Sequence, residues 1–194
     1  MKERTFLRTV FPLSAYSVIE QDAIVSRFVR VPFARQDFLL QEGKTAQVYW
    51  FLESGFVRSY VADPSGNDIS TAFFTPGNIV IDWPSFFMRV PTRENIQALS
   101  DCVCWQLGYA DFQDLFHSIV PFREQGRSNL VQSYFALKNR SISMIADQAK
   151  ERYRRLLKEK PEIVQNVSLK QIATYLGITD TSLSRIRREI AEET

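Results

Sequence analysis

The sequence contains few of the residues that build metal centres and covalent catalysts. Among its 194 residues are one histidine, His117, and two cysteines, Cys102 and Cys104. An iron–sulfur cluster needs four protein ligands and a haem needs an axial ligand, so neither cofactor is expected. A Ser-His-Asp triad would depend on the single histidine, and neither the phosphate-loop pattern GxxxxGKS/T nor the zinc pattern HExxH occurs. We therefore expect no enzyme, no metal site and no identifiable cofactor.

Long apolar runs are also missing. Arg8 and Pro12 interrupt the apolar residues near the amino terminus, so we predict neither a signal peptide nor a membrane span. A cytoplasmic protein is the expectation. Cys102 and Cys104 are two positions apart, so a strand would turn both to one face at a spacing too short for a disulfide between them. We expect a buried, reduced pair.

The sequence has little excess of charge of either sign. Its net charge is +2, and residues 146–194 contain ten Lys and Arg against eight Asp and Glu. This is a weak electrostatic signature for a nucleic-acid-binding protein, because such proteins usually concentrate positive charge on one face. Composition alone does not indicate DNA, so a prediction of that kind has to come from a motif.

The motif that the sequence does contain is a helical hairpin over residues 168–190, SLKQIATYLGITDTSLSRIRREI. Ser168 and Gln171 form the S-x-x-Q signature of a helix start. Gly177 ends this helix, because its freedom to adopt positive φ suits a bend, and Thr179 can cap a second helix. The apolar face of the first helix consists of Leu169, Ile172, Ala173 and Leu176.

The second helix of the hairpin has two different faces. Leu183, Ile186 and Ile190 share one face, whereas Arg185 and Arg188 lie on the opposite one. A helix-turn-helix of this kind can place its second helix in the major groove, where Arg bonds guanine O6 and N7. An ordinary helical hairpin with a solvated basic face is the alternative, and a short pattern leaves it open.

The candidate DNA-binding residues follow from these faces. We expect base-edge contacts from Thr181, Ser184 and Arg185, and phosphate contacts from Ser168, Lys170, Arg187 and Arg188. The set also includes Thr179, Asp180 and Ser182. A carboxylate at position 180 favours a helix start but repels phosphate.

The IATYLGIT and LSRIRREI segments of this hairpin resemble the Crp/Fnr family of bacterial transcription factors, to which the cyclic-AMP receptor protein belongs. The resemblance extends over nearly the whole chain. It implies a homodimer that binds double-stranded DNA, with RNA polymerase and a small-molecule effector as further partners and no membrane.

Residues 29–107 form short β-rich runs separated by turn residues. Closely spaced strands without long helices between them indicate an antiparallel roll or sandwich within an α+β protein. The resemblance implies a cyclic-nucleotide-binding-type β-roll, with Gly43, Gly55 and Gly77 at turns. Short helices are expected within residues 6–28. The predicted strands are near 29–33, 37–41, 48–53, 56–62, 68–74, 79–81, 95–99 and 102–107.

A short helix at 109–117 is expected to precede a longer one that Pro121 opens. Two adjacent apolar stripes along the longer helix can face a partner helix and the chain's own roll, and the resemblance places the dimerisation helix here. A single buried core helix is the alternative. The expected dimer contacts are Leu130, Tyr134, Leu137, Ser141 and Met144.

These elements divide the chain into a sensor domain, 1–118, a dimerisation helix, 119–144, and a DNA-binding domain, 145–194. We expect the hinge within the SISM segment, 141–144, and a basic amphipathic helix at 145–158, closed by Lys160 and Pro161.

In relatives that bind cyclic AMP, the Glu of a Gly-Glu-Leu segment holds the ribose, and a following Arg-Ser pair holds the phosphate. Here Ile81-Asp82-Trp83 and Thr92-Arg93 occupy the corresponding places. The glycine is missing, and the Arg is displaced by one position, which turns it to the other side of a strand. We therefore expect an effector other than cyclic AMP. The candidate effector residues are Asp82, Trp83, Phe86, Arg89, Thr92 and Arg93.

The sequence thus predicts a dimeric, sequence-specific DNA-binding transcriptional regulator with a β-roll effector domain. A ligand-independent dimeric scaffold, whose helical hairpin contacts protein instead of DNA, is the alternative. Relatives continue past the second helix into a β-hairpin wing, whereas residues 191–194 alone follow it here. We therefore also expect modest DNA affinity with a strong salt dependence.

Overall fold

The structure, a computed structural model, describes residues 4–193. Two short helices, α1 (Thr5–Val10) and α2 (Val18–Arg27), precede the strands. Each predicted strand is confirmed to within one residue at either end. The strands are β1 (Val29–Phe33), β2 (Phe38–Leu40), β3 (Val48–Ser54), β4 (Val57–Ala62), β5 (Asp68–Phe74), β6 (Ile79–Val80), β7 (Asn95–Ala98) and β8 (Cys102–Gly108).

The strands form two antiparallel sheets, in the orders β1-β8-β3-β6 and β2-β7-β4-β5. The predicted antiparallel roll is therefore confirmed. Its core is rich in aromatic rings from β3, from the segments that adjoin α1 and α2, and from the helices that follow β8. At Gly55 an added Cβ would lie 2.5 Å from the Asp101 carbonyl oxygen, so only glycine fits this turn.

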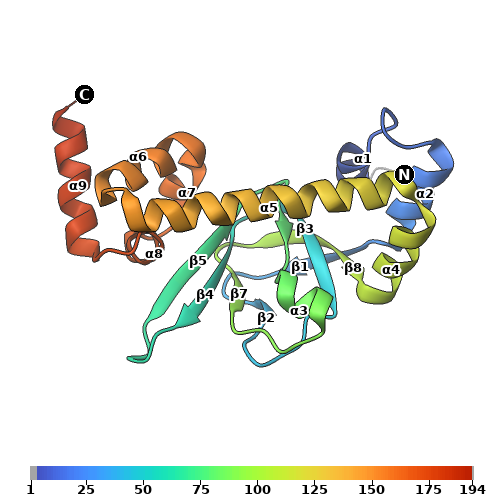
Figure 1. Cartoon of the computed structure of the whole chain (residues 1–194), viewed down its shortest axis with the longest axis horizontal. Helices are drawn as coiled ribbons and strands as arrows, with labels where there is room; N and C mark the ends of the chain where they lie inside the picture. Colours follow the sequence, from blue (N-terminus) through green and yellow to red (C-terminus); the bar gives the residue numbers. More distant parts are fainter. Residues whose placement is uncertain (1–3, 194) are drawn as a thin grey trace.

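A long helix, α5 (Val120–Ala146), connects the roll to the C-terminal helices and runs across the roll (Figure 1). Helix α4 (Tyr109–Ser118) lies with α1 and α2 near one end of α5. The predicted hinge within residues 141–144 is wrong, because the helix continues through this segment. Ser141 accommodates the helix by bonding the Leu137 carbonyl at 3.0 Å, and the chain first turns extended at Asp147 and Gln148.

Near the other end of α5 are α6 (Ala149–Glu159), α7 (Pro161–Asn166), α8 (Leu169–Tyr175) and α9 (Asp180–Glu192) (Figure 1). The basic helix begins at Ala149 rather than at residue 145. This helix ends at Glu159 with Lys160 as its C-cap, so the predicted end at Lys160 and Pro161 is confirmed. Pro161 also opens α7, which the sequence did not predict, because proline fits a first helical turn. The buried residues of these helices form a second core, which includes Phe73 from β5.

The C-terminal helices are docked on the roll through α8 and β5. The Ser70 backbone donates to Thr174 Oγ1 at 3.2 Å, and the rings of Phe73 and Tyr175 lie 5.0 Å apart. Lys160 Nζ donates to the Phe73 carbonyl at 3.2 Å. If the helical hairpin moves, it therefore has to break these contacts with β5 or carry β5 along with it.

Candidate nucleic-acid interface and effector cavity

Helices α8 and α9 form the predicted hairpin, with caps at the predicted residues. Ser168 Oγ accepts from the Gln171 backbone at 3.4 Å, and Thr179 Oγ1 accepts from the Ser182 backbone at 3.2 Å. Gly177 has φ +68° between the helices. A Cβ at this glycine would lie 2.6 Å from Met144 Cε, so the turn also packs tightly against α5. The hairpin is thus held at both of its helix starts and at its turn.

The predicted DNA-binding residues lie on both helices of the hairpin: Ser168 and Lys170 are at the start of α8, beside the turn at Gly66 and Asn67, and the others belong to α9 and its cap. The side chains of Arg187 and Arg188 are exposed and have no hydrogen bond or ion pair with any residue from 4 to 193. Arg185 has a side chain that is 76% exposed, and its only recorded ion pair, to Glu189, is long at 3.8 Å. Exposed as well are Ser168, Lys170, Thr179, Asp180, Thr181 and Ser184, whereas Ser182 is half-buried.

The cations of α6 are used differently, because they bond within the chain. Arg152 donates to the Leu176 carbonyl at 2.9 Å, and Arg155 donates to Asp147 Oδ2 at 2.7 Å. Lys150 pairs with Glu193 at 2.6 Å, and this hydrogen bond lowers the pKa of the Glu193 carboxyl. Glu193, at the end of α9, is thus tied to α6, whereas the side chains of Arg187 and Arg188 have no such partner among residues 4–193.

The segment that corresponds to the cyclic-AMP phosphate site folds into a short helix, α3 (Trp83–Met88), which the sequence did not predict. Asp82 caps it and accepts from the Ser85 backbone at 3.3 Å. Ser85 Oγ accepts from the Ala46 backbone at 2.8 Å and donates to the Val90 carbonyl at 2.7 Å. The polar groups around the start of α3 are therefore satisfied by the protein itself.

The arginines near α3 do not point into a phosphate site. Arg89 donates to the Ala46 carbonyl at 2.6 Å, and its guanidinium lies 4.3 Å from the centre of the Tyr109 ring. Arg93 is exposed, and Thr92 is buried in a turn, where its Oγ1 accepts from the Glu94 backbone at 3.0 Å. Burial raises the pKa of the Glu94 carboxyl, and the negative charge of the nearby Asp82 raises it further.

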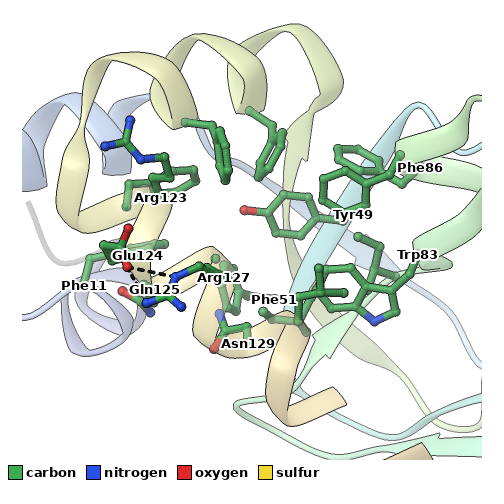
Figure 2. Close-up of a pocket in the computed structure, with 18 residues that line it drawn as sticks. Phe11, Tyr49, Phe51, Trp83, Phe86, Arg123, Glu124, Gln125, Arg127 and Asn129 are labelled. Atoms are coloured by element: carbon green, nitrogen blue, oxygen red, sulfur yellow. Dashed lines mark hydrogen bonds and ion pairs between the residues drawn. The ribbon is translucent and has the colours of Figure 1, made fainter. Parts of the chain in front are cut away.

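Two of the six candidate effector residues, Trp83 and Phe86, instead line an apolar cavity of about 260 Å³ between the roll and α5 (Figure 2). Asp82, Arg89, Thr92 and Arg93 are not part of its wall. The sequence analysis missed most of the lining, for which the 15 phenylalanines of the chain were the available signal. The remaining aromatic lining residues are Phe11, Tyr49, Phe51, Phe87, Phe112, Phe116 and Phe122.

The middle and C-terminal part of α5 exposes large apolar side chains. Leu137 is 63% exposed and Ile145 is 88% exposed. Of the predicted dimer contacts, Met144 also touches the hairpin turn at Gly177. The large exposed apolar residues in this part of the helix are Leu130, Val131, Tyr134, Phe135, Leu137, Ile142, Met144 and Ile145.

Cys102 and Cys104 are buried and not bonded to each other. Burial raises the pKa of the Cys104 thiol to about 12 and also raises that of Cys102. Within residues 4–193, no three His, Cys, Asp or Glu side chains gather in a way that could hold a metal ion. None of the helices in this range combines the length and hydropathy that a membrane span requires.

Comparison with known proteins agrees with this architecture. Residues 30–118 match the family model of the cyclic nucleotide-binding domain. No curated protein matches the chain significantly.

Among solved structures, FixK2 from Bradyrhizobium japonicum is 17% identical, with 86% of this chain and 85% of that chain covered and a TM-score of 0.76. A structure described as a transcriptional regulator of the crp/fnr family, from Eubacterium rectale, is 14% identical, with coverages of 95% and 88% and a TM-score of 0.73. The c-di-GMP responsive global regulator CLP of Xanthomonas campestris is 14% identical, with coverages of 91% and 93% and a TM-score of 0.70. Residues 30–118 are therefore similar to the cyclic nucleotide-binding domain, and the chain has the fold of solved Crp/Fnr regulators.

Proposed function

We propose that the chain is a homodimeric transcriptional regulator that binds duplex DNA through the outward face of α9. The observation that carries this proposal is the set of exposed arginines on a capped helix, of which Arg187 and Arg188 have no partner within residues 4–193. Phosphate contacts provide most of the affinity of such proteins for DNA, and Arg is suited to both phosphate and guanine. Two proteins of similar fold are named as regulators, which supports the same function.

The exposed apolar side of α5 supports the dimer. A helix that exposes Leu137, Ile142 and Ile145 to water is unfavourable for a monomer, and a second copy of the same helix can bury this surface. In a two-fold dimer the two α9 helices would meet successive turns of the major groove. We assign the sensor, the dimerisation helix and the DNA-binding domain to 1–118, 119–144 and 145–194.

An effector other than cyclic AMP would act through α5. The N-terminal part of this helix lines the cavity, and its C-terminal part contacts the DNA-binding hairpin. Arg140 donates to the Tyr175 carbonyl at 2.8 Å, and its guanidinium lies 3.8 Å from the centre of the Tyr175 ring. A ligand that favours one position of α5 would therefore shift the population of hairpin positions.

The test is selection of bound sequences from a random duplex pool at fixed salt. The wild-type protein is expected to enrich a two-fold-symmetric site with half-sites about one helical turn apart. Arg185→Ala is expected to lose specificity at one base pair in each half-site, because one base-edge contact is removed. Leu137→Glu is expected to give a monomer by sedimentation and to lose the symmetric site. A folded, dimeric wild-type protein that enriches nothing would favour the scaffold alternative.

A further inference from the structure

The cavity between the roll and α5 is large enough for a small organic molecule. Its volume is about 260 Å³. An apolar cavity of about 150 Å³ in another protein holds benzene, so the larger space can hold a substituted ring or two fused rings. Aromatic rings such as Trp83 and Phe87, which stack on each other at 5.7 Å, form much of its wall. The shape and chemistry of the wall thus suit a flat, apolar molecule.

One polar group on the inner wall has no partner in the protein. Tyr49 lies on β3, is 5% exposed, and its hydroxyl makes no hydrogen bond with any residue between 4 and 193. Figure 2 shows this hydroxyl pointing into the cavity, toward the side where the α5 residues lie. The protein supplies no hydrogen-bond partner at this position, so a ligand oxygen there can accept a hydrogen bond from the hydroxyl.

The charges around the cavity are confined to one side. Every charged lining residue is on α5, namely Arg123, Glu124 and Arg127, and Arg127 pairs with Glu124 at 2.7 Å. Gln125, from the same helix, is occupied by hydrogen bonds to Tyr16 and to the Val10 carbonyl. A cyclic phosphate placed against the inner wall would therefore lie on the opposite side of the cavity from these guanidinium groups.

We propose that this cavity binds a monocyclic or bicyclic aromatic molecule with one hydroxyl or carbonyl oxygen, which is hydrogen-bonded to the Tyr49 hydroxyl. This inference deepens the proposed function, because it gives the chemical class of the effector. The binding itself does not depend on DNA. Only its consequence for DNA rests on the proposed function: the ligand would contact α5 at Gly126 and Leu130 and would change the affinity for the selected site.

Gly126 provides a way to fill the cavity with a matched control. A Cβ added at this helical glycine would lie 3.8 Å from Phe116 Cε2, which is an ordinary contact. Gly126→Ala is therefore compatible with the fold and should stabilise the helix slightly. Gly126→Leu places a longer side chain toward the same wall and occupies space that the ligand would need.

The experiment is calorimetric titration of the full-length protein with 2-naphthol and, in parallel, with naphthalene. We expect one 2-naphthol per chain. Tyr49→Phe should lower the affinity for 2-naphthol by roughly three- to tenfold, which is the effect of one lost hydrogen bond. It should change the affinity for naphthalene by less than about twofold. Gly126→Leu should weaken the binding of both probes more than tenfold, and Gly126→Ala, which adds a single methyl group to the same wall, should weaken it by less. Thermal unfolding of each variant verifies that it is folded.

Two results would overturn the proposal. One is the absence of 2-naphthol binding to the folded wild-type protein. The other is equal binding by the wild-type protein, Tyr49→Phe and Gly126→Leu, which would place the probe elsewhere. Both results are measured without DNA. If the protein selects a symmetric duplex but does not bind the probe, only the proposed chemical class of the ligand is refuted. A protein that binds the probe as expected but selects no duplex refutes only the DNA-binding function.

Discussion

The outward face of α9 and the segment around α3 differ in where their polar groups are bonded. On α9, Arg187 and Arg188 project into solvent with no partner among residues 4–193. Around α3, by contrast, Ser85 and Arg89 bond to the backbone of neighbouring loops. A surface with unpaired cations can bind a polyanion without losing internal bonds. A segment with satisfied groups has to break such bonds before it can bind a phosphate.

The acidic groups strengthen this contrast. Near α3, the carboxyl groups of Asp82 and Glu94 are close enough for the charge of one to raise the pKa of the other. On α9, Glu189 and Glu193 are drawn toward Lys150 of α6. The structure thus places negative charge near α3, where a cyclic nucleotide would need positive charge. On α9 it pairs Glu189 with Lys150, although Glu189 also lies 3.8 Å from Arg185.

The largest effect is expected from the arginine that is bonded within the sensor. Arg89→Ala removes the hydrogen bond to the Ala46 carbonyl and the stacking on Tyr109, so it should lower the free energy of unfolding by about 1–3 kcal/mol. Arg93→Ala is the matched control and should change it by less than about 0.5 kcal/mol, because Arg93 is exposed. Urea unfolding measures both. Equal losses for the two variants would contradict the assignment of Arg89 to a structural role.

A smaller effect is expected on α9, and in DNA binding rather than stability. Arg188→Ala should reduce the slope of log affinity against log salt by about one, because one phosphate contact is lost, while melting stays unchanged. Lys44→Ala, an exposed cation on the sensor, should leave the slope as it is. Fluorescence anisotropy across a salt series gives these slopes. If both variants lower the slope alike, the contact is not specific to α9.

The smallest effect is the pH dependence caused by Glu94. Its folded-state pKa is raised, so the folded state binds more protons than the unfolded state between the ordinary and the raised value. Stability should therefore fall as pH rises through this window. At pH values above the raised pKa, Glu94→Gln should have a slightly higher melting temperature than the wild-type protein. At pH values below the ordinary pKa of glutamate, this difference should disappear. A melting series from acidic to neutral pH checks the prediction, with the exposed Glu42→Gln as control. An advantage that is the same at every pH would contradict it.

The sequence predicted the hairpin residues well because its signals are local. The cap at Ser168, the bend at Gly177 and the cap at Thr179 each depend on a few neighbouring residues. The strands were predicted for a similar reason, since turn residues separate them. The predicted hinge was wrong because a segment with two serines suggests an interruption of the helix. A serine can instead donate a hydrogen bond to a carbonyl of its own helix, as Ser141 does.

The cavity between the roll and α5 could not be predicted in the same way. Its wall combines Tyr49 from β3 with Phe86 from α3 and Phe112 from α4, which are far apart in the sequence. The alignment with cyclic-AMP-binding relatives directed attention to Asp82 and Arg93, and neither lines the cavity. The directions of the side chains determine which residues line such a cavity. These directions depend on tertiary packing, which a local sequence pattern does not reveal.

The most direct test of the contrast between α9 and α3 is calorimetric titration of one protein sample with the selected duplex and with cyclic AMP. The account predicts saturable binding of one duplex per dimer, with an affinity that falls steeply as salt rises, and no binding of cyclic AMP at millimolar concentration. Saturable binding of cyclic AMP that is lost in Arg89→Ala or Arg93→Ala, with no binding of duplex, would contradict it.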